Sequence, residues 1–156
     1  VIGSRTPDSE RLGDLVAEIG NGVEAAGLSN SVVGADVIVL AVPWKAAKDS
    51  VMALGDLSGQ TVIDATNPFV KGLNMGVSQD ESGGEFVAGW AIGANVVKAL
   101  NIVDARLLDG RKLDGREISI PICGDDEESK QIVIRLIAEL GFDTVDAGAL
   151  SNSILL

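Results

Sequence analysis

Apolar and amphipathic stretches alternate along the whole chain of 156 residues. Short apolar runs, such as DVIVLAVP at 36–43 and EISIPICG at 117–124, are typical of strands buried on both faces of a sheet. Between them, apolar residues recur every three or four positions, which is the period of a helix that buries one side. We predict strands at 1–2, 23–26, 36–43, 61–68, 95–101, 117–124 and 142–150, and helices at 7–19, 44–59, 81–92, 103–108 and 125–141.

Strands that alternate with helices predict an α/β fold with a doubly wound parallel sheet. At this length we expect a single domain that spans residues 1–156. Right-handed crossovers would bring the carboxyl ends of all strands to one edge, where such sheets bind ligands. We expect the site at that edge, because polar or glycine-containing segments follow five strands: GSRT (3–6), AVPW (41–44), ATNP (65–68), ALN (99–101) and DAGALSN (146–152).

Charge and cysteine content narrow the class of protein. The net charge of −11 argues against a nucleic-acid partner, because binding to phosphate backbones requires clustered Lys and Arg. No apolar run approaches the ~18 residues of a membrane span, so we expect no membrane partner. The single cysteine, Cys123, cannot form an internal disulfide, which fits a reducing compartment and a cytoplasmic location. We also expect a homo-oligomer that binds small molecules.

The chain contains no His and no Tyr. This composition excludes His-based acid–base catalysis, Ser-His-Asp triads, His-ligated metal sites and a Tyr proton donor. With one cysteine, thiolate metal clusters are excluded as well. If the domain is an enzyme, its chemistry must need little proton transfer from protein side chains, so we expect no catalytic acid or base and no metal.

The segment GSRT stands where a predicted strand ends and the chain turns into a helix. In dinucleotide-binding folds this position carries an acid for the ribose of NAD, whereas an Arg suits the 2′-phosphate of NADP. Arg5 supplies a fork of donors for a phosphate, and Ser4 and Thr6 add hydroxyl groups. The alternative is a surface Arg beside a Ser that caps a helix, and the spacing alone leaves both interpretations open.

Two further segments, AVPW and ATNP, place Pro directly after a buried strand. Pro removes an N–H and fixes the loop, so the preceding backbone could face a flat ligand, although the pattern alone favours simple strand termination. Trp44 and Trp90 fit either the core or the side of a ring-shaped ligand. The acidic run DDEE at 125–128 indicates a helix start stabilised by the helix dipole rather than a metal site.

Taken together, these segments resemble a known family. GSRT, LAVPWKAA (40–47), ATNP, VVKALN (96–101), ICGDDEESK (122–130) and VDAGALSNS (145–153) are similar, in order and spacing, to the NADP oxidoreductases that depend on the deazaflavin coenzyme F-420. The resemblance covers nearly the whole chain. It implies a Rossmann-like NADP-binding domain that transfers a hydride reversibly between NADP(H) and F-420.

The resemblance also implies roles for particular residues. Ser4, Arg5 and Thr6 would hold the 2′-phosphate, and Asn67 and Pro68 would lie near the stacked rings. The nicotinamide riboside would be lined by Ala41, Val42 and Pro43, with Trp44 beside them, and the deazaflavin would lie close to Gly148, Leu150 and Ser151. Hydride transfer between two planar rings needs alignment and exclusion of water rather than an acid–base pair, which agrees with the absence of His and Tyr.

Members of this family begin with a strand, a glycine-rich phosphate loop and a helix before the segment that VIGSRT resembles. We therefore expect the Rossmann-like domain to be incomplete at its N-terminus, with the first βα unit missing. Two alternative functions remain open. One is an NADPH-dependent reductase of a flavin or ferric acceptor, and the other is a dinucleotide-binding module without turnover.

Overall fold

The computed structural model describes residues 1–70, 75–108 and 118–156. Its strands are β1 (Ile2–Ser4), β2 (Ala25–Gly27), β3 (Val37–Leu40), β4 (Thr61–Asp64), β5 (Asn95–Lys98), β6 (Ser119–Gly124) and β7 (Asp143–Asp146). Its helices are α1 (Glu10–Ile19), α2 (Leu28–Ser31), α3 (Trp44–Leu54), α4 (Gly83–Trp90) and α5 (Glu127–Glu139), with the 3₁₀ helices η1 (Ala105–Leu107) and η2 (Leu150–Leu155). The order of elements confirms the predicted α/β alternation.

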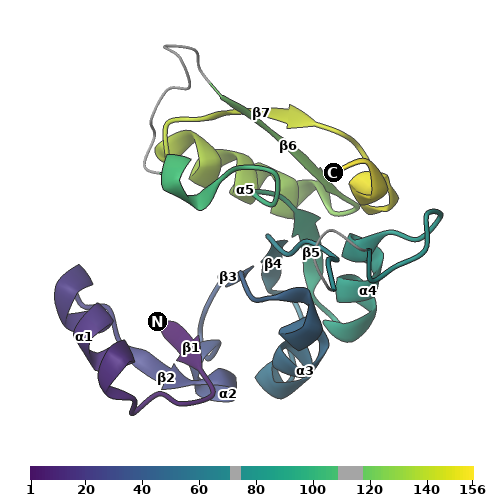
Figure 1. Cartoon of the computed structure of the whole chain (residues 1–156). Helices are drawn as coiled ribbons and strands as arrows, with labels where there is room; N and C mark the ends of the chain where they lie inside the picture. Colours follow the sequence, from purple (N-terminus) through teal and green to yellow (C-terminus); the bar gives the residue numbers. More distant parts are fainter. Residues whose placement is uncertain (71–74, 109–117) are drawn as a thin grey trace.

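The strands form two separate sheets. β1 and β2 pair in parallel, and the larger sheet has the order β3-β4-β5-β6-β7. The small sheet and α1 lie to one side of β3 (Figure 1). A groove of about 260 Å³ separates β1 from β3 and is lined mainly by apolar side chains, among them Leu28, Val37 and Leu40. We call it the β1–β3 groove.

One part of the predicted topology is wrong. β3, β4 and β5 are parallel, but β6 is antiparallel to β5, and β7 runs parallel to β6. A parallel connection needs a crossover, usually a helix. Where the structure describes the connection between β5 and β6, it contains only the short helix η1, so the chain reverses direction instead. β6 therefore approaches β5 from the opposite direction, and the two strands pair through their last residues, Val97 with Gly124 and Lys98 with Cys123.

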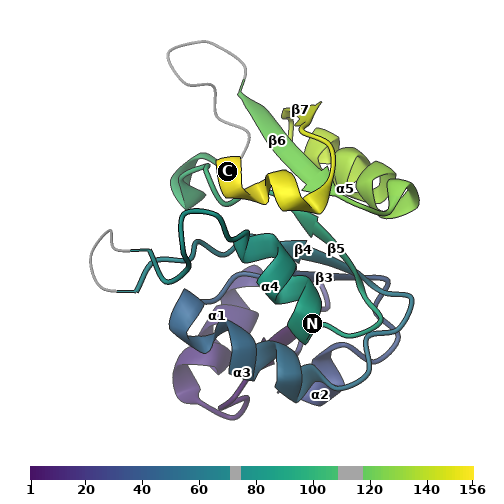
Figure 2. The ribbon, with the colours of Figure 1, turned by 90° about the vertical axis from the view of Figure 1, so that its right-hand side faces the viewer.

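The core has two layers because alternate residues of each strand point to opposite faces. Val62 and Val96 face one layer, where they pack with residues of α3 and α4. Ile63 and Val97 face the other, where they pack with β6 and α5. Figure 2 shows α3 and α4 lying together on their side of the sheet, while α5 covers the other. Among the described residues, no helix is long and apolar enough to cross a membrane.

Apolar side chains of the N-terminal elements are more exposed to solvent than the sequence pattern predicts. The apolar residues Leu15 and Ile19 of α1 are 43% and 45% exposed, and Val39 of β3 is 55% exposed. The prediction that β3 is buried on both faces is therefore wrong for Val39. The reason is its position: β3 is the end strand of its sheet and borders the β1–β3 groove rather than another strand.

Two further predictions concern the connection between β5 and β6. The predicted helix at 103–108 is the single 3₁₀ turn η1. The predicted start of a strand at Glu117 lies outside the described residues.

Hydrogen bonds explain the acidic run at 125–128: Asp126 caps α5 by accepting the Ser129 N–H at 2.7 Å, and Asp125 accepts the Leu150 N–H at 2.9 Å. The interpretation of this run as a helix start is confirmed.

The cap of α5 gives a test of this interpretation. The backbone N–H of Ser129 holds the pKa of Asp126 below its ordinary value of 3.8. Its contribution to stability is therefore present above pH 3.8 and is lost as the pH falls through the lower pKa of the folded state. Asp126→Ala should lower the thermal midpoint at neutral pH, whereas Asp126→Asn should keep most of the cap.

The difference between the wild type and Asp126→Ala should shrink on acidification, as measured by thermal denaturation at a series of pH values. A difference that stays constant into strong acid would contradict the assigned role of the carboxylate.

Candidate functional site

The carboxyl ends of β4 and β5 border a cavity of about 200 Å³, which we call the edge cavity. Asn67 and Pro68 line it from the loop after β4, and Lys98 and Asn101 line it from β5 and the turn that follows. Apolar side chains form much of the remaining wall, including Phe69, Met75, Val77, Ile154 and Leu156. The cavity thus combines apolar surface with a few polar groups, as is usual for small-molecule sites.

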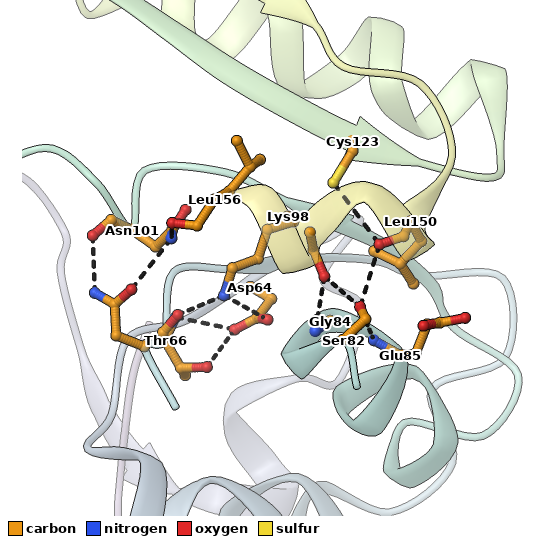
Figure 3. A network of polar contacts seen from close by, with 12 residues as sticks. Asp64, Thr66, Ser82, Gly84, Glu85, Lys98, Asn101, Cys123, Leu150 and Leu156 are labelled. Carbon is orange, nitrogen blue, oxygen red and sulfur yellow. Dashed lines mark hydrogen bonds and ion pairs between the residues drawn. The ribbon is translucent and has the colours of Figure 1, made fainter. Parts of the chain in front are cut away.

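A buried ion pair connects the two strands at this edge. The Nζ of Lys98 donates to Oδ2 of Asp64 at 2.9 Å and also to the carbonyl oxygen of Thr66 (Figure 3). The two side chains are 2% and 0% exposed. The other carboxylate oxygen of Asp64 accepts from the N–H and the hydroxyl of Thr66, at 2.9 and 2.7 Å. These bonds fix the turn that leads from β4 into Asn67.

Asp64 and Lys98 were missed by the sequence analysis. Each sits at the end of an apolar strand, in VID and VVK, where a charged residue is unexpected and could have been a signal. Their partnership depends on the register of two strands that are 34 positions apart, in which Asp64 lies directly opposite Lys98. Sequence spacing alone does not specify that register.

The amides of Asn67 and Asn101 form a second connection across the same edge. Nδ2 of Asn67 donates to the backbone carbonyl of Asn101 at 2.8 Å, and Nδ2 of Asn101 donates to Oδ1 of Asn67 at 3.2 Å. Asn101 Nδ2 also donates to the backbone oxygen of Leu156 at 2.9 Å. Within the described residues, Oδ1 of Asn101 is buried and accepts no hydrogen bond, a situation that typically costs about 1–3 kcal/mol.

The predicted phosphate-binding residues lie at the end of β1. Ser4 ends the strand, and its Oγ accepts the Thr6 N–H at 3.1 Å, while Arg5 is exposed between them. In the described part of the chain, no carboxylate forms an ion pair with Arg5. The guanidinium is therefore available to an anion from solution.

The residues after β3 connect that strand to the start of α3. Ala41 and Pro43 are exposed, Val42 lines the groove, and Pro43 immediately precedes α3. Trp44 packs against Trp90, with ring centroids 5.3 Å apart and planes inclined at 44°. Both Trp side chains also pack against the core around α3 and α4, which favours the core-filling interpretation for them.

Gly148, Leu150 and Ser151 do not join the edge cavity. The segment follows β7, which is two strands away from β5 in the sheet, and Leu150 lines a separate small hollow with Asn95 and Val96. The Leu150 side chain is 3% exposed and belongs to the core. The expectation that all five strand ends meet at one edge of a single sheet is wrong, because β1 belongs to a separate two-stranded sheet.

η2 nevertheless returns the chain to the edge cavity. The helix runs beside α4, where Oγ of Ser153 lies 2.5 Å from Oγ of Ser82 and accepts the Gly84 N–H at 3.0 Å (Figure 3). As a result, Ser153, Ile154 and Leu156 line the cavity, instead of the earlier residues that the sequence analysis selected.

Few groups near the cavity can exchange a proton. The carboxylate of Glu81 accepts the Ser78 N–H at 2.8 Å, and this bond lowers its pKa. The ammonium of Lys98 is engaged by Asp64 and Thr66. Burial raises the pKa of Cys123 to about 11, so its thiol is neutral at physiological pH. The arrangement suits the binding and alignment of a flat ligand better than acid–base chemistry.

Comparison with known proteins gives a consistent picture. Residues 1–68 match the family model described as NADP oxidoreductase, coenzyme F420-dependent. The chain is 29% identical over 154 residues to metalloreductase STEAP3 of Rattus norvegicus. That match covers 98% of the chain but 30% of STEAP3, so the chain spans under a third of this relative.

Two solved structures are similar over nearly the whole chain. A hypothetical protein, SMa0349 of Sinorhizobium meliloti, superposes with a TM-score of 0.84 at 32% identity, covering 99% of this chain and 76% of that one. A protein named as a proposed F420-dependent NADP reductase of Arthrobacter sp. FB24 superposes with a TM-score of 0.87 at 27% identity, covering 98% and 75%. These matches confirm the Rossmann-like fold class.

The buried ion pair yields a stability prediction. Lys98→Met leaves the carboxylate of Asp64 buried and unpaired, so the free energy of unfolding should fall by ~3–5 kcal/mol. The double variant Asp64→Asn/Lys98→Met should recover much of this loss, because no isolated charge remains and Asn still accepts from Thr66.

Chemical denaturation measures both effects. Arg106→Met is the matched control, since the ion pair of Arg106 with Asp104 is at the surface and should contribute little. A loss for Lys98→Met no larger than for the control would show that the buried pair does not stabilise the sheet.

Proposed function

This chain belongs to the family of NADP oxidoreductases that depend on coenzyme F420, and from that premise we propose that it transfers a hydride reversibly between NADP(H) and the deazaflavin F-420. Membership of this family makes the chain part of an NAD(P)-dependent oxidoreductase. The choice of F-420 as the second cofactor is the proposed step.

The observation that carries the proposal is the chemistry of the edge cavity. Its wall is largely apolar, and the titratable groups beside it, Glu81 and Lys98, are held by hydrogen bonds to protein partners. These residues fit a flat ring. Nicotinamide and deazaflavin rings supply the hydride chemistry themselves, so the protein needs only to align them and exclude water.

The chain's residues would divide the binding of NADP(H) between them. Arg5, with Ser4 and Thr6, would bind the 2′-phosphate through charge-assisted hydrogen bonds. Ala41, Val42 and Pro43 would contact the nicotinamide riboside, where the fixed φ of Pro43 keeps the loop rigid. Asn67 and Pro68 would lie against the rings, because both line the edge cavity.

The segment after β7 would serve the deazaflavin mainly through η2. Gly148 and Ser151 do not line the edge cavity, and the side chain of Leu150 is in the core. Contact of Gly148, Leu150 and Ser151 with the deazaflavin would have to be made by backbone groups or at the start of the helix. Ser153 and Ile154, further along η2, already line the cavity.

The assembly of the working enzyme is also part of the proposal. Among the described strands, none pairs with β1 or β3 along the β1–β3 groove, which supports a further strand with a glycine-rich turn between them. Residues 1–156 with that unit would form one Rossmann-like domain. The exposed apolar face of α1, with Leu15 and Ile19, supports a homo-oligomer, and the reduced Cys123 supports a cytoplasmic location.

A second candidate acceptor is favoured by one specific observation. The 29% identity to a metalloreductase supports an NADPH-dependent reductase of a flavin or ferric acceptor. Absorbance of NADPH, followed with F-420, a flavin and a ferric chelate supplied separately to the intact protein, distinguishes these functions. Oxidation that is fastest with F-420 supports the first proposal, and fastest oxidation with either other acceptor supports the second.

Binding of each nicotinamide cofactor tests the role of Arg5. In the intact protein, Arg5→Ala should weaken NADPH binding by ~10-fold or more, because a charge-assisted contact to the 2′-phosphate is lost. NADH lacks that phosphate, so its affinity should hardly change. Arg135→Ala is a matched control, because it removes an equal charge from an exposed position on α5.

Isothermal titration with both cofactors provides the measurement. If Arg5→Ala weakened NADPH and NADH equally, or if Arg135→Ala had the same effect, the assignment of Arg5 to the 2′-phosphate would be refuted.

A further inference from the structure

One wall of the edge cavity is built by a short helix that has little attachment of its own. η2 is a 3₁₀ helix of six residues, of which only Leu150 and Ser153 are buried, whereas Ile154 and Leu155 are exposed. Short 3₁₀ helices have poor hydrogen-bond geometry, so neighbouring elements must determine where they lie. Ser153 and Ile154 line the cavity, as does Leu156 directly after the helix. The position of η2 therefore determines the position of this wall.

A chain of hydrogen bonds attaches η2 to the start of α4. The Gly84 N–H donates to Oγ of Ser153 at 3.0 Å, and Oγ of Ser153 lies 2.5 Å from Oγ of Ser82 (Figure 3). Oγ of Ser82 also accepts the Glu85 N–H at 3.2 Å and lies 3.4 Å from the carbonyl oxygen of Leu150. With Ser153 donating to Ser82 and Ser82 donating to Leu150, both hydroxyl protons and both N–H groups have partners. Because both serines are buried, removing one link leaves polar groups without a partner or water.

A glycine lets the two helices approach closely enough for this chain to form. A Cβ atom at Gly84 would lie 2.7 Å from Oγ of Ser153, which is too close for a real contact, and 3.0 Å from Cδ1 of Leu150. Glycine weakens a helix relative to alanine, so a glycine at the second position of α4 indicates that this space is needed. The three atoms nearest to that Cβ all belong to η2, so a change at Gly84 acts on the cavity through η2.

We propose that Gly84 and Ser153 are positioning residues that hold η2 against α4 and thereby set the width of the edge cavity and its affinity for the deazaflavin ring. The inference rests on the proposed function. Gly83, the first residue of α4, lines the same cavity. If η2 moved away from α4, the wall between Gly83 and Ile154 would open. The ring would then lose contacts, and water would enter beside it.

Gly84→Ala in the intact protein tests this role. The added methyl group should push η2 away from α4 and weaken the binding of F-420 by about 10-fold, as measured by fluorescence titration. Backbone amides of η2 should also exchange hydrogen faster in the ligand-free variant. Alanine favours a helix more than glycine does, so these losses would not come from α4 itself.

Gly89→Ala is the matched control for this substitution. It makes the same change in the same helix, at a position where an added Cβ has no neighbouring atom within 4 Å. It should leave both the affinity for F-420 and the hydrogen exchange of η2 unchanged.

A double-variant cycle with Ser153→Ala distinguishes positioning from direct contact with the ring. Ser153→Ala alone should weaken F-420 binding by about threefold, because η2 loses its hydrogen bonds to α4. It also removes the oxygen that the methyl group at position 84 would meet. In that background Gly84→Ala should therefore cost no more than about twofold in affinity. If Ser153 acted by touching the ring, Gly84→Ala would have the same effect in both backgrounds.

Ser129→Ala controls for the loss of stability that a missing hydroxyl group causes. Oγ of Ser129 lies 2.9 Å from Oγ1 of Thr61 in a buried pair at the start of α5, outside the edge cavity. The variant should lower the thermal midpoint, as Ser153→Ala does, but leave the affinity for F-420 unchanged.

The outcomes separate this inference from the proposed function. A folded Gly84→Ala variant that binds F-420 as tightly as the wild type overturns the inference, as does an equal loss in Gly89→Ala or an equal effect in both backgrounds of the cycle. If Gly84→Ala does not fold, a Ser153→Ala variant that loses no more affinity than Ser129→Ala overturns it. A wild-type protein that binds no F-420 overturns the proposed function and this inference with it.

Discussion

The buried ion pair between Asp64 and Lys98 is the interaction on which the site depends. A charge in the interior is tolerated only with a partner and further hydrogen bonds, and both groups have them here. This requirement constrains the geometry in several ways. The ion pair reinforces the register of β4 against β5. Its bonds to Thr66 hold the turn after β4, and Asn67 on that turn lines the edge cavity.

The second constraint comes from the reversal of the chain after β5. β6 pairs with β5 in the opposite direction, β7 ends two strands away from β5, and η2 then runs back beside α4. Its path is held by the hydroxyl groups of Ser82 and Ser153 and by the burial of Leu150. The same crossing brings Leu156 within hydrogen-bond distance of Asn101. Leu156 thus takes part in holding the Asn101 side chain in place.

The two ends of the proposed cofactor site have different physical characters. Arg5 is an exposed cation on a turn, and its interaction with a phosphate would be partly screened by water and salt. Asn101 is a neutral group held in a protected place by neighbours on other elements. In the proposed function, Arg5 selects the cofactor by its charge, whereas Asn101 and Asn67 hold together the two turns that border the edge cavity. Neither role requires a titrating side chain, in keeping with a chain that lacks His and Tyr.

Local patterns determined much of this protein. Alternating apolar runs and amphipathic stretches predicted the elements, and the segments after β1, β3 and β4 identified Arg5, Pro43 and Asn67 as candidates. These features depend on residues close in sequence, where periodicity and turn chemistry act directly. The direction of β6, the exposure of Val39 and the pairing of Asp64 with Lys98 were decided only by the tertiary structure. Each depends on which distant segment lies alongside, and the energy of a buried contact belongs to both partners, so neither local sequence specifies it alone.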